Sequence, residues 1–164
     1  MGKFTSIGEK IFQNRDELAQ ILNRIRSEKT VVFTNGCFDI LHRGHVSYLS
    51  RAGDLGDVLV VALNTDSSVQ KLKGSGRPVN SELDRAFVLA SLACVDYITF
   101  FSEQTPEKTI EILKPDIHTK GGDYQAEELP EKAILDQLGS RIVLLPFEDG
   151  FSTTSIIKKA SLKS

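Results

Sequence analysis

The chain has 164 residues, of which 40% are hydrophobic and 26% are charged, values that are ordinary for one soluble globular domain. Its formal net charge of −2 argues against a broadly basic surface, so we expect no nucleic-acid partner and no membrane partner. There is no apolar run of about 18 residues and no signal-peptide pattern, and Cys37 and Cys94 form no spaced framework, so we expect a cytoplasmic protein.

The first clear pattern in the chain is an amphipathic helix. Leu18, Leu22 and Ile25 recur at helical spacing after Asn14, a good N-cap residue, and predict a helix over residues 15–27. Residues 1–13 carry no clear signal. We therefore interpret the chain as a single domain, residues 1–164, with an N-terminal helical extension over residues 1–28 and a core over residues 29–164.

The next stretch places two histidines between a strand and a helix. Residues 31–33 are β-branched and aromatic and predict a short buried strand, and a helical pattern begins near His45. A helix N-terminus offers free N–H groups to a phosphate, imidazoles at His42 and His45 can donate to phosphoryl oxygens, and Gly44 permits close approach of the backbone. This pattern indicates a phosphoryl- or nucleotidyl-transfer site.

Two other interpretations of the histidines stay open. They could simply cap or pack the start of the helix. Cys37, Asp39, His42 and His45 could also bind zinc, although no second cluster in the sequence completes such a site.

Strands and helices then alternate along the rest of the chain. The predicted strands after the first are residues 57–63, 95–101, 115–119 and 141–146, and the predicted helices are residues 45–53, 66–72, 81–92, 105–113, 127–138 and a closing helix that begins at Ser152. This order predicts an α/β fold, a single three-layer Rossmann-like domain with a mostly parallel five-stranded sheet and helices on both faces. Ligands of such sheets bind beyond the carboxyl ends of the strands.

Polar and glycine-rich clusters follow several of these strands. Lys71, Lys73 and Arg77 give an electropositive, glycine-broken segment that suits a triphosphate, with a solvated surface turn as the alternative. Residues 152–154 predict a helix N-cap that could also cradle a phosphate. Asp84 and Arg85 could form a surface ion pair. The P-loop pattern, the glycine-rich dinucleotide pattern and the Gly-x-Ser-x-Gly pattern are absent from the sequence.

Taken together, these motifs resemble a known family. Residues 35–45, Asn-Gly-Cys-Phe-Asp-Ile-Leu-His-Arg-Gly-His, look like the His-x-Gly-His signature of the cytidylyltransferase-like nucleotidyltransferases, and residues 152–157 look like their C-terminal signature. Residues 72–78, 95–97, 120–124 and 147–150 resemble the D-glycero-β-D-manno-heptose 1-phosphate adenylyltransferases. These are often one half of a bifunctional protein whose other half is a sugar kinase, and the absence of a kinase half here suggests the free-standing form.

The resemblance implies a reaction and a set of site residues. It implies transfer of AMP from ATP to a heptose 1-phosphate, giving ADP-heptose and pyrophosphate, with Mg²⁺ held mainly by substrate oxygens and no metal-binding residue of the protein. The implied catalytic residues are His42, His45, Lys71 and Arg77. The implied nucleotide-binding residues are Asn35, Gly36, Cys37, Phe38, Asp39, Gly44, Asn64, Asp66, Lys73, Lys120, Gly121, Gly122, Asp123, Ser152, Thr153 and Thr154.

Some expectations remain open at the level of sequence. The nucleotide could be CTP and the acceptor glycerol 3-phosphate or another small phosphate ester; the chain could also bind a nucleotide without turnover, or be a metal-dependent hydrolase. We expect a homo-oligomer, such as a dimer. His118 and Thr119 depart from the family pattern, since apolar strand residues are expected before the Lys-Gly-Gly turn.

Overall fold

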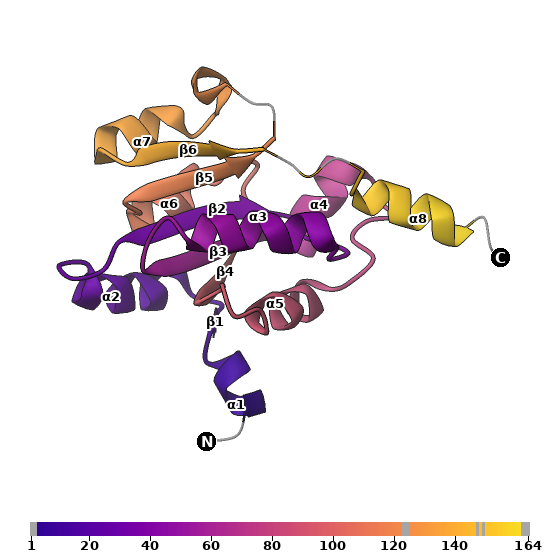
Figure 1. Cartoon of the computed structure of the whole chain (residues 1–164), viewed down its shortest axis with the longest axis horizontal. Helices are drawn as coiled ribbons and strands as arrows, with labels where there is room; N and C mark the ends of the chain where they lie inside the picture. The colour runs from indigo at the N-terminus through magenta and orange to yellow at the C-terminus, as the bar shows by residue number, and fades with distance from the viewer. Residues whose placement is uncertain (1–2, 123–124, 147, 149, 162–164) are drawn as a thin grey trace.

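A computed structural model of the chain describes residues 3–122, 125–146, 148 and 150–161 (Figure 1). Within them lies one parallel sheet of six strands, in the order β1-β4-β3-β2-β5-β6. The strands are β1 (Ile11–Phe12), β2 (Val31–Gly36), β3 (Val58–Asn64), β4 (Tyr97–Phe101), β5 (Ile117–Gly121) and β6 (Arg141–Leu145).

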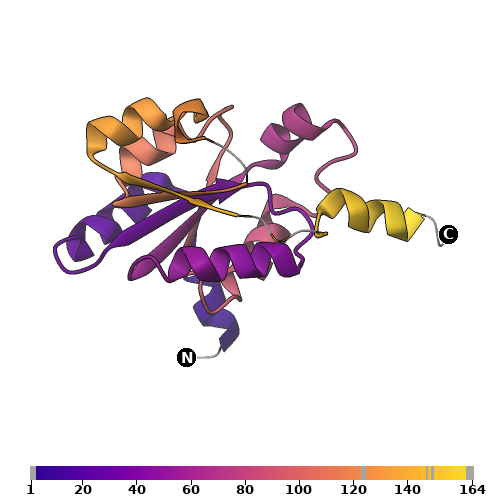
Figure 2. The same cartoon turned by 45° about the horizontal axis from the view of Figure 1, so that its top comes forward.

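Helices cover both faces of this sheet, which confirms the predicted three-layer α/β architecture (Figure 2). The helices are α1 (Lys3–Gly8), α2 (Arg15–Ile25), α3 (Arg43–Gly53), α4 (Asp66–Lys73), α5 (Glu82–Ala90), α6 (Glu107–Leu113), α7 (Lys132–Leu138) and α8 (Thr153–Ser161), with a 3₁₀ turn over Ala126–Glu128. None of the helices in these residues is long and apolar enough to cross a membrane.

The described residues form two hydrophobic cores, one on each face of the sheet, because side chains alternate between the two faces along a strand. Val32 of β2 points into a core formed with α3 and α5, whereas its neighbours Val31 and Phe33 point into a core formed with α2, α6 and α7. All seven residues of β3 are buried, as expected for a parallel strand covered on both sides.

Among the described residues the sheet has six strands instead of the expected five. The additional strand, β1, pairs with β4 at the sheet edge. It has only two residues, both half-buried, so it leaves no hydrophobic pattern in the sequence. The helix that follows it, α2, contributes the fully buried Leu18 and Leu22 to the core.

The helix expected over residues 127–138 was also wrong in extent. A 3₁₀ turn occupies its first residues and the α-helix begins only at Lys132. The cause is Pro130, because a proline disfavours helical backbone in the residue before it, and Leu129 is extended, with ψ 124°.

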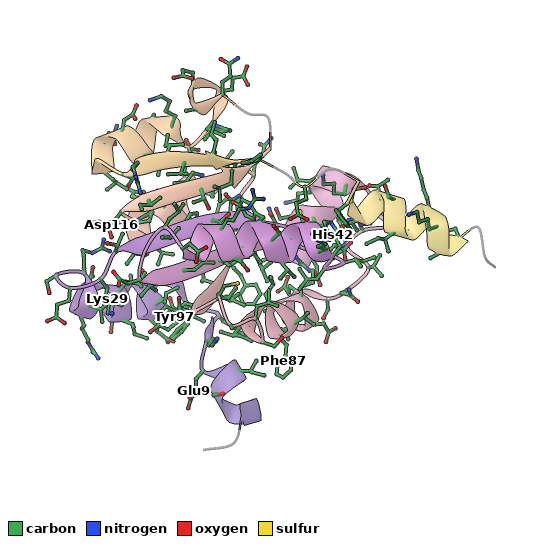
Figure 3. All side chains as sticks on the ribbon, viewed as in Figure 1. Glu9, Lys29, His42, Phe87, Tyr97 and Asp116 are labelled. Carbon is green, nitrogen blue, oxygen red and sulfur yellow. The ribbon has the colours of Figure 1, made fainter. Side chains whose placement is uncertain are left out.

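The order of the strands fixes where a ligand site can form. From β2 the chain adds β3 and β4 on one side, and it then returns to place β5 against the other side of β2. The carboxyl ends of β2 and β5 therefore border a topological switch point, where open α/β sheets bind their ligands. His42 lies at this end of the molecule, with Lys29 and Asp116 at the opposite end (Figure 3).

Helix α8 differs from the other helices. It runs outward from this end of the sheet (Figures 1 and 2), and none of its residues is buried. Only its first turn therefore belongs to the region of the switch point.

Candidate active site

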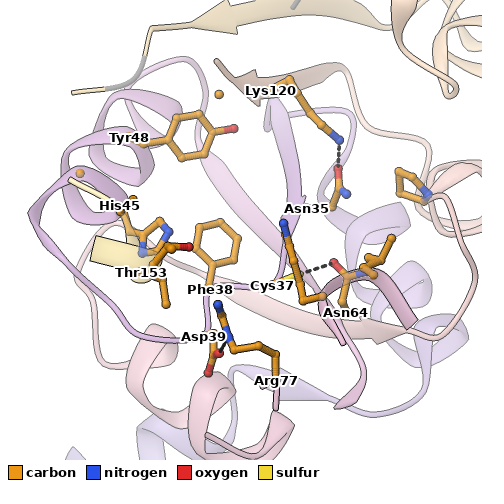
Figure 4. Close-up of a pocket in the computed structure, with 18 of the residues that line it drawn as sticks. Asn35, Cys37, Phe38, Asp39, His45, Tyr48, Asn64, Arg77, Lys120 and Thr153 are labelled. Carbon is orange, nitrogen blue, oxygen red and sulfur yellow. Dashed lines mark hydrogen bonds and ion pairs between the residues drawn. The ribbon is translucent and has the colours of Figure 1, made fainter. Parts of the chain in front are cut away.

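A cavity of about 1010 Å³ opens at the carboxyl ends of the strands (Figure 4). Its size lies at the upper end of the range for small-molecule sites. It brings together most of the site residues expected from the sequence, namely Asn35, Gly36, Cys37, Phe38, Asp39, His42, Gly44, His45, Asn64, Lys73, Arg77, Lys120, Gly121, Ser152, Thr153 and Thr154.

Three of the expected residues that the structure describes do not line the cavity. Lys71 and Asp66 do not line the cavity, and Asp66 instead pairs with Arg85 at 2.8 Å. Gly122 also lies outside the lining, with a positive φ of 123° that suits glycine at this turn. Asp123 lies outside the described residues.

The two histidines lie at the start of α3, as expected. His42 is the N-cap, and its Nδ1 accepts a long hydrogen bond, 3.4 Å, from the backbone N–H of His45. Because Nδ1 accepts, the proton of a neutral His42 ring lies on Nε2. The two rings stack with centroids 3.7 Å apart.

Burial makes both histidines weak bases in the free protein. It lowers the pKa of His42, and it lowers the pKa of His45 further, to about 4, with an added contribution from the nearby His42. Nδ1 of His45 is buried and has no hydrogen-bond partner in the described part of the chain. The free site therefore presents neutral imidazoles that can donate hydrogen bonds or gain a proton when an anion arrives.

Gly44 allows the dense packing around these rings. A Cβ at this position would lie 3.2 Å from ring atoms of His42 and 3.2 Å from the Cβ of Phe151. Phe151, which precedes α8, faces the His42 ring and also the guanidinium of Arg43, which lies 5.8 Å from its centroid. Arg43 pairs with Glu148, so the segment before α8 is held against the start of α3.

The first turn of α8 reaches the same place. The Ser152 side chain accepts from the backbone N–H of Ser155, which makes it the cap expected from the sequence. Thr153 donates to the carbonyl of Ile40 at 3.4 Å, from its position on the cavity wall.

Asp39 organises the loop on the other side of the histidines. Its buried carboxylate accepts from Nε of Arg77 at 2.5 Å and from the backbone N–H groups of Val79 and Asn80. Burial alone would raise the pKa of Asp39, but these hydrogen bonds and the charge of Arg77 lower it below its ordinary value. This use of the Asp39 carboxylate explains how residues 77–80 are held at the cavity.

Arg85 has a role that the sequence did not suggest. The proposed surface ion pair of Asp84 and Arg85 is wrong, because Arg85 is 2% exposed and pairs with Asp66. Its guanidinium also donates to the backbone carbonyls of Cys37, Asn64 and Asn80. Arg85 thus ties together three segments beneath the cavity.

Its place on the helix is a signal that sequence reasoning missed. Arg85 falls next to Ala86 and on the same face as Leu89, on the apolar side of α5. A charged residue on the inward face of a helix indicates a buried partner.

Cys37 and Asn64 form the floor of the cavity between β2 and β3. The thiol of Cys37 lies 3.7 Å from Oδ1 of Asn64, whose amide donates to Ser68. Burial raises the pKa of the Cys37 thiol, so it is a weak hydrogen-bonding group here and not an activated nucleophile.

The side chain of Lys120 on β5 reaches across the switch point to Asn35 at the end of β2. Its ammonium donates to Oδ1 of Asn35 at 3.2 Å and to Oε1 of Glu131 at 3.0 Å. Glu131 also accepts from Nε2 of the buried His118 at 3.0 Å, with the proton on that nitrogen. The unexpected His118 therefore has a buried carboxylate as its partner, and Thr119 hydrogen-bonds to Tyr48.

The cavity continues away from the histidines along a wall that sequence reasoning did not identify. It is lined there by residues from the end of β4, from the segment after it and from the segment before α7, namely Phe101, Gln104, Thr105, Pro106, Glu128, Leu129 and Pro130. No short motif marks these residues, because they come from two parts of the chain that only the fold brings together.

Among the cations that line the cavity in the described part of the chain, Lys73 differs from the others. Arg77 pairs with Asp39 and Lys120 pairs with Glu131, whereas Lys73 has no carboxylate within ion-pair distance. No three His, Cys, Asp or Glu side chains among the described residues are placed to hold a metal ion. The arrangement can thus bind a polyanion through neutral donors, cations and helix N-termini.

Comparison with known proteins places this geometry in context. The sequence profile described as cytidylyltransferase-like matches residues 33–159, which include all the cavity residues named above. The chain is 53% identical over 148 residues to the bifunctional protein HldE of Citrifermentans bemidjiense, covering 90% of this chain and 30% of that protein. It is 55% identical over 134 residues to the bifunctional protein HldE of Helicobacter pylori, covering 82% and 28%. The chain therefore spans about a third or less of the length of these relatives.

Solved structures show the same fold. A lipopolysaccharide core biosynthesis protein from Thermoplasma volcanium aligns with a TM-score of 0.59 and 32% identity, covering 73% of this chain and 97% of that one. Pantoate–β-alanine ligase from Francisella tularensis, at 18% identity and a TM-score of 0.59, covers 93% of this chain and 77% of that one, and it supports the fold alone.

Proposed function

Because the chain belongs to the cytidylyltransferase-like family, we propose that it is a nucleotidyltransferase that transfers AMP from ATP to D-glycero-β-D-manno-heptose 1-phosphate. The products are ADP-heptose and pyrophosphate. The observation that carries the proposal is the stacked pair His42 and His45 at the N-terminus of α3, facing a cavity lined by Thr153 and Lys120. The choice of a heptose phosphate rests on the motifs in the sequence and on the similarity to the HldE proteins.

The reaction needs little covalent chemistry from the protein. An oxygen of the sugar 1-phosphate attacks the α-phosphorus of ATP, and the bond from that phosphorus to the β-bridging oxygen breaks. Pyrophosphate leaves with the electron pair of the broken bond. A phosphate monoester is already an anionic nucleophile near neutral pH, so no general base is required, and catalysis depends on positioning and charge stabilisation.

We assign the histidines to the reacting phosphoryl groups of ATP. The proton on Nε2 of His42 makes this ring a donor to a phosphoryl oxygen. His45, stacked against it, is placed to gain a proton as negative charge accumulates. The free N–H groups at the start of α3 add the positive end of the helix dipole.

The remaining donors surround the same polyanion. Lys73 supplies a cation with no carboxylate partner among the described residues, and Arg77 supplies one that Asp39 orients. Thr153 and the first turn of α8 supply a hydroxyl and backbone N–H groups close to the histidines. Lys71 does not line the cavity, so we assign the contact with the triphosphate to Lys73 and not to Lys71.

We propose that Mg²⁺ enters this reaction with the triphosphate. Phosphate oxygens are the hard ligands that Mg²⁺ prefers, and its sites in such enzymes use few protein groups. The lining carboxylates Asp39, Glu131 and Glu148 are already paired with Arg77, Lys120 and Arg43. The fourth, Glu128, accepts from the backbone N–H of Gln125, so these groups fit the role of protein ligands poorly.

The decisive experiment is a substrate screen that follows pyrophosphate release. ATP or CTP is combined with heptose 1-phosphate or glycerol 3-phosphate, and we expect release with ATP and heptose 1-phosphate. Preference for CTP and glycerol 3-phosphate would replace the proposed substrates within the same family. Calorimetric binding of ATP without turnover on any acceptor would indicate a nucleotide-binding protein instead.

We propose the cytoplasm as the compartment, because ATP and sugar phosphates are available there. A homo-oligomer also remains a proposal, supported by the exposed apolar side chains Val79, Leu83 and Val88 on and near α5. Light scattering after size-exclusion chromatography measures the oligomeric state directly.

A further inference from the structure

Two buried side chains, His118 and Glu131, lie next to the proposed phosphate site and have no part in the reaction described above. His118 is 0% exposed and Glu131 is 1% exposed. Oε1 of Glu131 lies 3.0 Å from Nε2 of His118 and 3.0 Å from the ammonium of Lys120, which lines the cavity wall. His118 and Lys120 are two residues apart on β5, so their side chains leave the same face of the sheet. Glu131, directly before α7, packs onto that face.

Glu131 is held as an anion by His118 and Lys120. Burial would raise its pKa, but the hydrogen bond from His118 and the charge of Lys120 lower it to about 2. His118 is neutral, since burial lowers its pKa. The contact of Glu131 and Lys120 is therefore a true ion pair, with His118 as a neutral donor to the same oxygen.

The stability of the fold does not by itself explain why Glu131 and Lys120 form an ion pair here. Oε2 of Glu131 and Nδ1 of His118 are both buried without a hydrogen-bond partner in the described residues. A buried ion pair with unsatisfied atoms is often no more stable than apolar side chains of the same size. Its presence at this position therefore points to an effect on the residue that reaches the cavity, Lys120.

The contacts of Lys120 show how Glu131 affects it, because they fix the position of the ammonium. The ammonium of Lys120 has three N–H donors, of which one is directed to Asn35 and one to Glu131. One donor remains for a ligand, and Lys120 lines the cavity. Two fixed contacts restrict a side chain that is otherwise very flexible.

We propose that Glu131, oriented by His118, is a positioning residue that fixes the Lys120 ammonium to receive a phosphoryl oxygen of a bound substrate. This inference deepens the proposed function and rests on it for the identity of the substrates. The phosphoryl oxygen can belong to ATP or to the sugar 1-phosphate, and the two are distinguished by measuring each ligand separately.

The test is a double-mutant cycle with Glu131→Gln, Lys120→Ala and the combined variant. Calorimetry gives the Kd of each variant for ATP and for heptose 1-phosphate, and steady-state kinetics give KM and kcat. If Glu131 acts through Lys120, Glu131→Gln raises the Kd for one of the two ligands roughly 10-fold when Lys120 is present and less than about 2-fold when residue 120 is alanine. The ligand whose Kd rises identifies the source of the phosphoryl oxygen.

Two controls accompany the cycle. Lys132→Ala removes the neighbouring lysine of α7, which pairs with Asp136, and should leave both Kd values unchanged. His118→Leu should reproduce the loss seen in Glu131→Gln, and His118→Gln, which keeps a donor, should restore part of it. Thermal unfolding of every variant separates binding losses from misfolding.

Equal losses with and without Lys120, or no loss of affinity for either ligand, would overturn the inference. Absence of pyrophosphate release by the wild-type protein would contradict the proposed function instead. The Kd cycle needs no turnover, so it still decides whether Glu131 acts through Lys120.

Discussion

The imidazole rings of His42 and His45 stack with their centroids 3.7 Å apart and their planes inclined by 18°. Two protonated imidazoles would repel each other at this distance, so the contact requires that at least one ring be neutral. A bound polyphosphate changes this balance, because its negative charge favours the protonated form. The pair is thus stable as neutral donors in the free site and can adopt positive charge when the substrate binds.

Replacing either histidine should abolish most of the activity while the fold survives. We expect His45→Ala to lower kcat by roughly 10²–10⁴-fold, the range for the loss of one preorganised donor or proton-transfer group. Pyrophosphate release measures the loss, and circular dichroism and thermal unfolding check the fold. Val46→Ala, which changes the exposed next residue of α3, is the matched control. Near-wild-type turnover in a folded His45→Ala variant would remove the histidine from the mechanism.

ATP binding should be accompanied by proton uptake at about pH 6. The pKa of His45 is about 4 in the free protein, and the charge of the triphosphate should raise it toward or above its ordinary value of 6.5. Calorimetric titrations in two buffers of different ionisation enthalpy give the number of protons taken up. His45→Gln should reduce that number. An equal uptake in the variant and the wild type would show that another group gains the proton.

The same pKa difference predicts how stability depends on pH. Well above pH 6.5 the folded and unfolded states both hold His45 neutral, whereas between about pH 4 and pH 6.5 the unfolded state binds the proton and the folded state does not. The free energy of unfolding should therefore fall as pH decreases from 6.5 toward about 4. Thermal unfolding of wild type and His45→Gln across this range isolates the contribution of His45, because Asp39 and other residues titrate in both proteins. Parallel curves for the two proteins would contradict the assignment.

Lys73 and Lys71 provide a matched pair for the phosphate site. Lys73 lines the cavity without a carboxylate partner in the described residues, whereas Lys71, two residues earlier on α4, does not line it. We expect Lys73→Ala to raise the KM for ATP roughly 10-fold and Lys71→Ala to change it by less than about 2-fold. The reverse order of effects would return Lys71 to the catalytic role that the sequence first suggested.

Arg85 should be required for stability. Replacing it with methionine leaves the Asp66 carboxylate and the backbone carbonyls of Cys37 and Asn64 without their donor. We expect the free energy of unfolding to fall by at least about 1–3 kcal/mol, the cost of leaving a buried acceptor without its donor, whereas the Asp66 side chain is 34% exposed and can be solvated instead. Urea unfolding measures it, with Arg24→Met on the exposed face of α2 as the control. A loss no larger than that of the control would show that the Arg85 contacts contribute little.

Much of the fold was predictable because buried strands and amphipathic helices leave local patterns. The all-apolar stretch of β3 indicated a parallel sheet covered on both faces, and Asn14 caps its helix as predicted. The elements that were missed or misjudged leave weak patterns. Strand β1 is two residues long, and the start of α7 depends on the restriction that Pro130 imposes.

The sequence alone determined the family, the three-layer α/β class and the group of residues that meet at the carboxyl ends of the strands. These follow from local order along the chain, since each motif directly follows its own strand. The tertiary structure decided which charged groups are partners. Asp39 with Arg77, Asp66 with Arg85 and Glu131 with Lys120 join elements that fold back on each other, and hydrogen-bond partners are set by distance in space, which spacing along a chain does not encode.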